Sequence, residues 1–179
     1  KHKNFVEQIQ IGPSFEDIVS SLPINNNLKC EFKKEYKKEY NKCILKDTYY
    51  YENATKILIA LKEDFHLSIV TNKRSETTDI LIKHFEWSNI FDYIYCSDSG
   101  RKNISKKESL GQLIKNDNKY ENSIYIGDTR NDYEAAIFNG LRFIRASYGY
   151  GDYDSWNLDS TFTEIHSISE LPSTLKTII

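Results

Sequence analysis

The sequence predicts an α/β protein in which a doubly wound, Rossmann-like parallel sheet is joined to a small helical subdomain. From residue 53 onward, short apolar segments alternate with segments of helical periodicity, the order typical of right-handed βαβ units. Two of the apolar segments end in polar residues that suit a ligand site at the carboxyl ends of parallel strands. Before residue 48 the periodicity is helical only. We therefore expect a helical subdomain over residues 1–47 and an α/β core over residues 48–179.

The individual elements follow from this alternation. In the core, helices are expected over residues 53–63, 76–85, 106–116, 131–139 and 168–177, and strands over 67–71, 92–96, 123–127, 142–146 and 160–165. In the helical subdomain we expect a short helix over 14–21, a turn over Ile24–Asn27 and a helix over 29–43. Phe32, Tyr36 and Tyr40 recur at helical spacing on that last helix, so its many lysines indicate a solvated face more than a nucleic-acid surface.

The composition indicates a domain of ordinary size with little net charge. The chain has 179 residues, a formal net charge of −2 and a pI near 6.1, which give no electrostatic case for a nucleic-acid or membrane partner. Cys30, Cys43 and Cys96 show neither CxxC nor metal-ligand spacing and indicate reduced thiols. We expect a cytoplasmic protein, a monomer or homodimer, that acts on a small molecule.

The strongest chemical signal lies in residues 123–136. There an apolar strand ends in Gly127 and Asp128 and passes at once into a helix, with Asp132 one turn further on. Two carboxylates at the carboxyl end of a strand suit a Mg²⁺ ion that neutralises phosphate oxygens. The structural alternative is that these acidic residues only cap the helix.

Two further junctions carry weaker signals. The strand over 67–71 ends in Thr71-Asn72-Lys73, where a hydroxyl and the backbone amides after it can donate to phosphate oxygens, or can simply cap a helix. The polar loop after residue 98 leads to Lys106 and Lys107 at a helix start. One of these ammonium groups can complete an anion site, and both can equally be solvated.

In their order and spacing these elements resemble the haloacid dehalogenase (HAD) superfamily of phosphatases, and within it the phosphoglycolate-phosphatase-like branch. Thr71 matches the second family motif, whose hydroxyl binds the transferred phosphoryl group, and the sequence Thr71-Asn72-Lys73 looks like a form common in that branch. Gly127, Asp128 and Asp132 match the fourth motif, GDxxxD. The resemblance implies a HAD-like core with a helical cap over residues 1–47.

The resemblance also implies roles for these residues. Asp128 is expected to be a catalytic Mg²⁺ ligand, and Asp132 to lie in or next to the coordination shell of the metal. Thr71, Asn72 and the lysine of the third motif are expected to bind phosphate. For that catalytic lysine we choose Lys107, with Lys106 close behind, although the proline that follows it in relatives is missing here.

The first family motif, DxDGT, has no counterpart in this sequence. It supplies the nucleophilic aspartate and an aspartate acting as general acid and base, and no DxD occurs upstream of Thr71. Ile11-Gly12-Pro13 resembles the middle of the family's cap, so we expect an amino-terminal portion, with that motif and the first, central strand, to be missing. Because that strand lies between the strands ending at Thr71 and Gly127, we expect these two not to pair with each other.

The function implied by the resemblance is Mg²⁺-dependent hydrolysis of a small, phosphoglycolate-like phosphomonoester through an aspartyl-phosphate. Two alternatives remain: a phosphomutase of the same superfamily, and a non-catalytic interaction protein that has kept the fold. Two other segments are similar to family segments without carrying chemistry. Tyr51 begins one that leads toward the second motif, and Ser147-Tyr-Gly-Tyr-Gly resembles the loop after the fifth strand.

Overall fold

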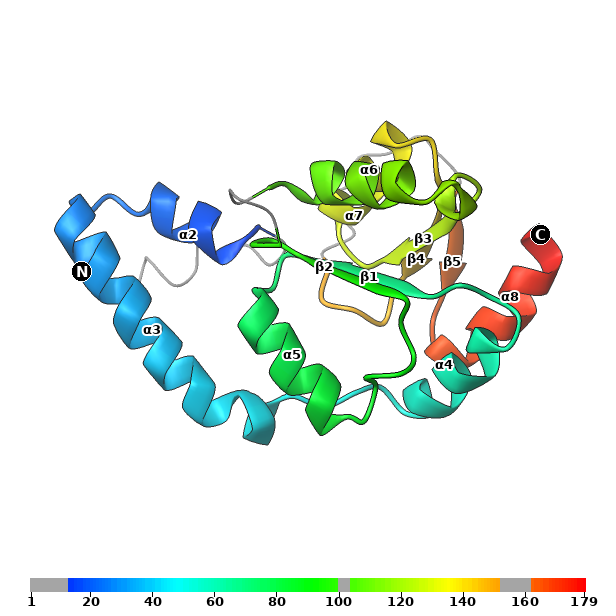
Figure 1. Cartoon of the computed structure of the whole chain (residues 1–179), viewed down its shortest axis with the longest axis horizontal. Coiled ribbons are helices and arrows are strands. Elements are labelled where there is room, and N and C mark those ends of the chain that lie inside the picture. The colour runs from blue at the N-terminus through cyan, green and yellow to red at the C-terminus, as the bar shows by residue number, and fades with distance from the viewer. Residues whose placement is uncertain (1–12, 100–103, 152–161) are drawn as a thin grey trace.

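A computed structural model describes residues 13–99, 104–151 and 162–179 of the protein (Figure 1). Residues 11 and 12 of the segment that resembles the family's cap, and residues 100–103 of the loop before Lys106, lie outside the described residues.

The strands form two parallel sheets. β1 (Ser68–Thr71) pairs with β2 (Tyr93–Cys96). In the second sheet β4 (Arg142–Ala146) lies between β3 (Ile124–Gly127) and β5 (Thr163–Ile165). Every one of these pairings is parallel, as the alternation of strands and helices predicts.

Helices cover both faces of the strands. They are α4 (Ala54–Lys62), α5 (Ser75–His84), α6 (Lys106–Asn116), α7 (Arg130–Phe138) and α8 (Leu171–Ile178), with 3₁₀ turns at Asn118–Tyr120 and Ile168–Glu170. Figure 1 shows α6 and α7 on one side of the sheets, and α4, α5 and α8 on the other. Successive residues of β4 point to opposite faces: Phe143 packs in the core under α6 and α7, and Ile144 in the core with α4 and α8. The predicted doubly wound α/β fold is therefore confirmed.

Strands β1 and β3 belong to different sheets and are not paired with each other in the part of the chain that the structure describes, as predicted. Side chains link them instead. The Tyr125 hydroxyl of β3 donates to the carbonyl oxygen of Val70 in β1 at 3.2 Å. Ile126 of β3 is 37 % exposed, whereas Ile144 of β4 is completely buried. The strands on either side of this boundary are thus less well covered than the centre of the second sheet.

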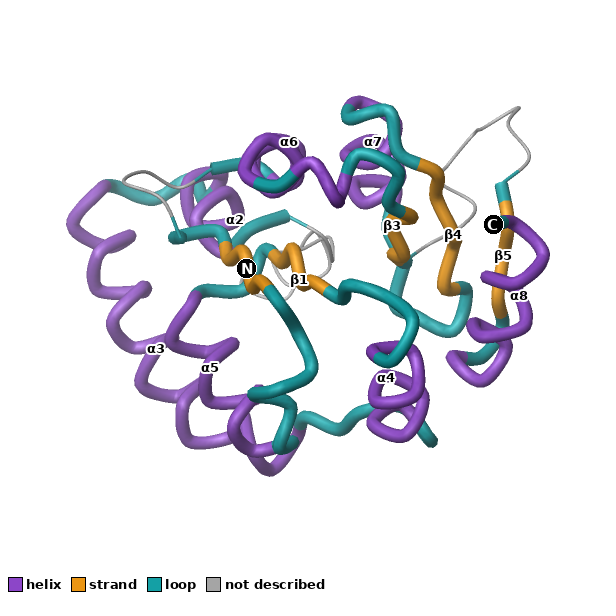
Figure 2. Tube along the Cα trace, turned by 45° about the vertical axis from the view of Figure 1, so that its right-hand side comes forward, coloured by secondary structure: helices purple, strands orange, loops and turns teal. Residues whose placement is uncertain are grey.

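The amino-terminal helices, α2 (Phe15–Ser21) and α3 (Asn26–Asp47), form a separate layer beside α5 (Figure 2). The Phe15 ring of α2 stacks on Tyr36 of α3 with 4.2 Å between ring centres. The turn predicted over residues 24–27 is wrong for residues 26 and 27, which already belong to α3. The helix starts there because Asn25 caps it: the Asn25 side chain accepts a hydrogen bond from the Leu28 amide at 2.9 Å. The division into a cap over 1–47 and a core over 48–179 stays a prediction, although α3 ends at Asp47.

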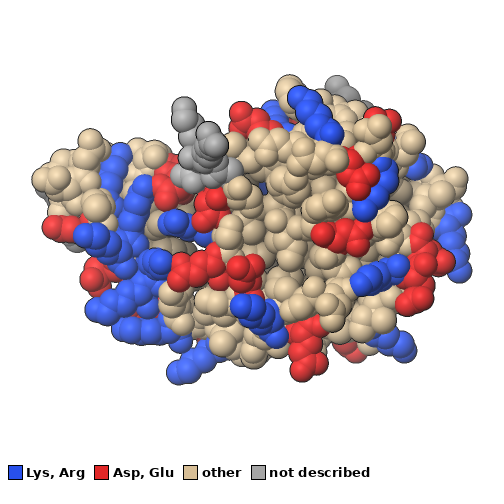
Figure 3. Space-filling model, viewed as in Figure 1, with Lys and Arg blue, Asp and Glu red and all other residues tan. Residues whose placement is uncertain are grey.

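Lysine side chains gather over α3, on the left of Figure 3, and they are solvated or paired with acids. Lys42, for example, lies 2.7 Å from Glu39 on the same exposed helix face. None of the helices among the described residues combines the length and the apolar character needed to cross a bilayer.

Candidate active site

The turn between β3 and α7 carries both carboxylates of the GDxxxD sequence. Thr129 is the N-cap of α7, and its hydroxyl accepts a hydrogen bond from the Asp132 amide at 3.3 Å. In return, Oδ2 of Asp132 accepts hydrogen bonds from the Thr129 amide at 3.0 Å and from its hydroxyl at 2.6 Å. This reciprocal capping box fixes the first turn of the helix. Capping, the structural alternative for these acids, is therefore a real part of what Asp132 does.

Asp132 is buried, and donors occupy both of its carboxylate oxygens. Oδ1 lies 2.5 Å from the Lys106 ammonium and 3.4 Å from the Tyr125 hydroxyl, while Oδ2 takes the two Thr129 donors. Burial by itself would raise the pKa of Asp132, but the charge of Lys106 and hydrogen bonds from Lys106 and Thr129 hold it below its usual range. Lys106 and the two Thr129 groups thus donate to the carboxylate, while the single Tyr125 hydrogen can serve either Asp132 or the Val70 carbonyl. The expectation that Asp132 lies in or next to the coordination shell of a metal stays a prediction.

Lys106 stands at the first position of α6. Its N-cap, Ser105, forms a capping box with Glu108, so the helix begins at Lys106. The side chain is only 10 % exposed and that of its partner Asp132 is 5 % exposed. A nearly buried ammonium group is thereby held beside Asp132, close to the carboxyl end of β3.

Lys107 points elsewhere. Its ammonium lies 3.7 Å from Glu134 of α7 and 5.7 Å from the centre of the Phe138 ring, on the solvent-exposed side of the two helices. The structure thus places Lys106, and not Lys107, beside Asp132, which favours Lys106 as the lysine of the site; the phosphate-binding role stays a prediction. The sequence held a signal that favours Lys106: the Ser105–Glu108 capping pattern fixes the helix start, and the buried residues Ser109, Leu110 and Leu113 follow Lys106 at helical spacing.

Thr71 ends β1, as predicted. Its hydroxyl oxygen accepts a hydrogen bond from the Lys73 amide at 3.1 Å and keeps its own hydrogen for donation. Asn72 is half-buried at the same turn. The Lys73 ammonium is directed to α3, where it lies 3.3 Å from the Tyr40 hydroxyl.

Tyr125 brings the two strand ends together. The one hydroxyl group lies within 3.2 Å of the Val70 carbonyl, next to Thr71, and within 3.4 Å of Asp132. Burial, and after it the nearby Asp132 charge, raises the pKa of Tyr125, which keeps the phenol a donor. Since α6 also packs on β1, Thr71, Asp132 and Lys106 share one region at the carboxyl ends of β1 and β3. Sequence reasoning did not identify Tyr125, because a tyrosine in an apolar strand is usually core.

Asp128 lies under the loop that follows β4. The amide of Tyr150 donates to Oδ2 of Asp128 at 2.7 Å. Gly149 and Gly151 touch Asp128 so closely that a Cβ atom on Gly149 would clash with its side chain and one on Gly151 with its carbonyl oxygen. The Asp128 side chain is half-buried, and its close contact with the loop leaves room for glycine only at positions 149 and 151.

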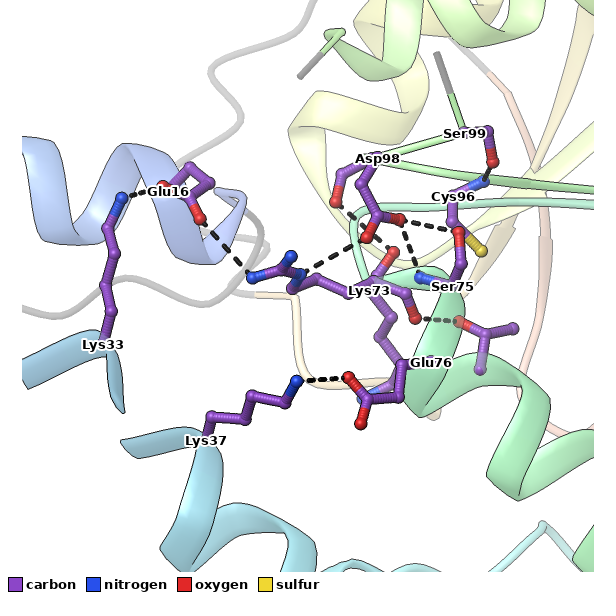
Figure 4. A network of polar contacts seen from close by, with 12 residues as sticks. Glu16, Lys33, Lys37, Lys73, Ser75, Glu76, Cys96, Asp98 and Ser99 are labelled. Atoms are coloured by element: carbon purple, nitrogen blue, oxygen red, sulfur yellow. Dashed lines mark hydrogen bonds and ion pairs between the residues drawn. The ribbon is translucent and has the colours of Figure 1, made fainter. Parts of the chain in front are cut away.

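Ion pairs connect the helical subdomain to the turn after Thr71 (Figure 4). Asp98, after β2, accepts hydrogen bonds from the amide and the hydroxyl of Ser75 at 2.7 Å, and it lies 3.3 Å from the Arg74 guanidinium. Arg74 in turn lies 3.8 Å from Glu16 of α2, and Lys37 of α3 lies 2.7 Å from Glu76. Since exposed ion pairs each stabilise a fold only slightly, this network orients α2 and α3 beside the site without holding them firmly.

A Mg²⁺ ion is commonly bound by one or two carboxylates together with water and substrate phosphate. Asp128 offers one half-buried carboxylate of this kind. The Asp132 oxygens already accept hydrogen bonds from Lys106 and Thr129, which favours a place next to the coordination shell over direct ligation. Across residues 13–99, 104–151 and 162–179, no three His, Cys, Asp or Glu residues are grouped to hold a metal. Among these described residues, Asp128 is the carboxylate that best fits a direct Mg²⁺ ligand.

Residues 4–146 match the family model described as haloacid dehalogenase-like hydrolase, so the chain belongs to this family. The family resemblance predicted from Thr71, Asp128 and Asp132 is thereby confirmed. No curated protein matches the sequence.

Solved structures share the fold. One is described as a predicted phosphatase from Clostridium acetobutylicum: the match covers 93 % of this chain and 79 % of that one, with a TM-score of 0.80 and 23 % identity. The match to a predicted phosphoglycolate phosphatase from Haemophilus somnus 129PT covers 92 % of this chain and 79 % of that one, with a TM-score of 0.77 and 18 % identity. The match to protein tyrosine kinase A from Mycobacterium tuberculosis covers 92 % of this chain and 78 % of that one, with a TM-score of 0.73 and 21 % identity. Likeness at this level of identity concerns the fold, and these three descriptions differ in activity, so the reaction has to be argued from the site.

Proposed function

We propose that this HAD-like hydrolase is a Mg²⁺-dependent phosphatase acting on a small phosphomonoester. The observation that carries the proposal is the Lys106 ammonium, nearly buried against Asp132 beside the end of the strand that carries Thr71. A cation in such a place is costly unless it has a partner, and its one carboxylate partner leaves ammonium hydrogens for a second acceptor. An anion that enters beside Thr71 completes this arrangement.

In the proposed site each residue has a separate task. Thr71 and the Asn72 turn donate hydrogen bonds to phosphoryl oxygens, and Lys106 neutralises part of their charge as the ester bond breaks. Asp132 orients Lys106 through the contact between its Oδ1 and the ammonium group. Asp128 would hold Mg²⁺, which when bound withdraws electron density from the phosphoryl group.

Hydrolysis through an aspartyl-phosphate is part of the proposal on the strength of the family resemblance. In that route an aspartate oxygen bonds to phosphorus as the ester oxygen leaves, and water then releases phosphate. We do not assign the nucleophile to Asp128 or Asp132, because the first is the proposed metal ligand and the second accepts hydrogen bonds on both oxygens, from Lys106 and Thr129. A phosphoglycolate-like substrate is proposed from the Thr71-Asn72-Lys73 sequence.

The test is phosphate release by the purified full-length protein from a panel of phosphomonoesters, with Mg²⁺ and with EDTA. We expect Mg²⁺-dependent turnover of at least one ester, and we expect Asp128→Asn to lower it by well over tenfold, the scale of a lost charged ligand. The matched control is Glu134→Gln, an exposed acid on α7, the helix that begins just after Asp128, and it should leave turnover unchanged. Lack of Mg²⁺-dependent release from every ester, or near-normal turnover by Asp128→Asn, would contradict the proposal.

A further inference from the structure

The Asp128 carboxylate is held by a loop and not by its own strand. Its Oδ2 accepts the Tyr150 amide at 2.7 Å, and the loop over residues 147–151 leaves no space for a side chain at Gly149. Any displacement of this loop therefore changes the position of the carboxylate. What fixes the loop also fixes Asp128.

Two contacts fix the loop from opposite sides. On the β5 side, the amide and the hydroxyl of Ser147 both donate to the Ile165 carbonyl, at 3.0 and 3.1 Å. On the other side, the Tyr51 hydroxyl donates to the Tyr148 carbonyl at 3.2 Å, and the Tyr51 and Tyr148 rings meet edge to face with 4.7 Å between their centres.

Tyr51 is itself attached to the core. It lies in the segment between α3 and α4, and its carbonyl accepts a hydrogen bond from the Ala54 amide at 3.0 Å at the start of α4. Asn53, in this turn, has a left-handed backbone conformation with φ of 63°, so the turn has a defined shape. The phenol is thus carried by the segment that leads out of the helical subdomain.

We propose that Tyr51 is a positioning residue for Asp128, which holds the 147–151 loop where the Tyr150 amide meets the Asp128 carboxylate. The path runs from the segment between α3 and α4 through the Tyr51 hydroxyl, the Tyr148 carbonyl and the Tyr150 amide to the proposed metal ligand. The inference depends on the proposed function only for the role of Asp128.

The electrostatic surroundings agree with this path. Burial, and after it the neighbouring Tyr150 and Asp128, raises the pKa of Tyr51. Burial, Tyr51 and Asp128, in that order, raise the pKa of Tyr148 to about 12. Both phenols therefore stay protonated at neutral pH, and Tyr51 stays a hydrogen-bond donor.

The test follows the Tyr150 amide by ¹H–¹⁵N NMR in the purified full-length protein. In the unaltered protein this amide should exchange slowly with solvent. Tyr51→Phe keeps the ring and removes the hydroxyl. We expect it to speed exchange of the Tyr150 amide about tenfold, the scale of one lost hydrogen bond.

The matched control is Tyr49→Phe in the same segment. The Tyr49 hydroxyl also donates to a backbone carbonyl, that of Lys46 at 2.6 Å, but the side chain is 81 % exposed. Tyr49→Phe should leave the Tyr150 amide unchanged. The inference is overturned if Tyr51→Phe leaves exchange of this amide unchanged, or if Tyr49→Phe speeds it equally.

A reciprocal measurement keeps the inference testable should Tyr51→Phe fold poorly. In Asp128→Asn the ring resonances of Tyr51 at neutral pH should change their chemical shifts, while those of Tyr49 should not move, and unchanged Tyr51 resonances overturn the coupling. Neither measurement needs turnover. Failure of the coupling thus leaves the phosphatase proposal standing, and an inactive protein still reports on the coupling.

Discussion

Two ion pairs of the same chemical type join α6 to α7 in different surroundings. Lys106 and Asp132 lie 2.5 Å apart with side chains 10 % and 5 % exposed, whereas Lys107 and Glu134 lie 3.7 Å apart at 38 % and 41 %. The lysines are neighbours in sequence, but consecutive residues of a helix point about 100° apart. The comparison teaches that one residue of helical register separates a site residue from a surface residue.

The largest expected effect comes from removing the buried lysine. Lys106→Met leaves the Asp132 charge buried without its cation, so we expect a loss of about 3–5 kcal/mol in the free energy of unfolding. Urea denaturation measures it. The control Lys107→Met should cost about 1 kcal/mol or less, because its partner stays solvated. Equal losses in the two variants would refute the distinction between the pairs.

A double-mutant cycle separates the pair energy from the effect of each side chain. We expect a coupling of about 1–3 kcal/mol between Lys106→Met and Asp132→Asn, since these groups are in contact and nearly dry. For Lys107→Met with Glu134→Gln the expected coupling is about 0.2–1 kcal/mol. Unfolding free energies of the four proteins in each cycle supply both values, and a larger coupling in the exposed pair would be evidence against this account.

The pH dependence of stability should follow Asp132. Its pKa in the folded protein lies below the usual range, so its contribution is fully present above the unfolded pKa of about 3.9 and is lost as the pH falls through the folded value. Asp132→Asn should therefore weaken the loss of stability in acid relative to the unaltered protein. Melting temperatures measured from pH 6 down to about pH 2 test this, and Glu134→Gln, the control, should follow the unaltered protein.

The smallest expected effect is that of salt on the exposed pair. At about 1 M salt the screening length falls to roughly 3 Å, so the small cost of Glu134→Gln should vanish. The cost of Asp132→Asn should change little, because salt screens a close and nearly buried pair much less than an exposed one. Denaturation at low and high salt checks both, and a strong salt effect on the Asp132 variant would mean that the Lys106–Asp132 pair is screened like a surface pair.

The fold class and most of the helices and strands could be predicted from the sequence alone. Apolar segments alternating with amphipathic ones permit only a parallel sheet with helices on both faces, and β1, β3 and α7 lie where this periodicity places them. The Gly127-Asp128 and Thr71-Asn72 junctions fall at strand ends for the same local reason. Short-range patterns suffice here, because backbone geometry repeats every two or 3.6 residues.

How the site residues share their tasks depends on packing between segments that are distant in the sequence. That Asp132 accepts from Lys106 and not from Lys107 depends on how α6 packs against α7, and that Tyr125 reaches Val70 depends on how the two sheets sit side by side. The Tyr51 contact with the loop over Asp128 joins residues 97 positions apart. Contacts of this kind arise from packing between distant segments, and such packing leaves no periodic pattern in the sequence. From the sequence alone, the same polar residue types are therefore equally compatible with helix caps, surface groups and site residues.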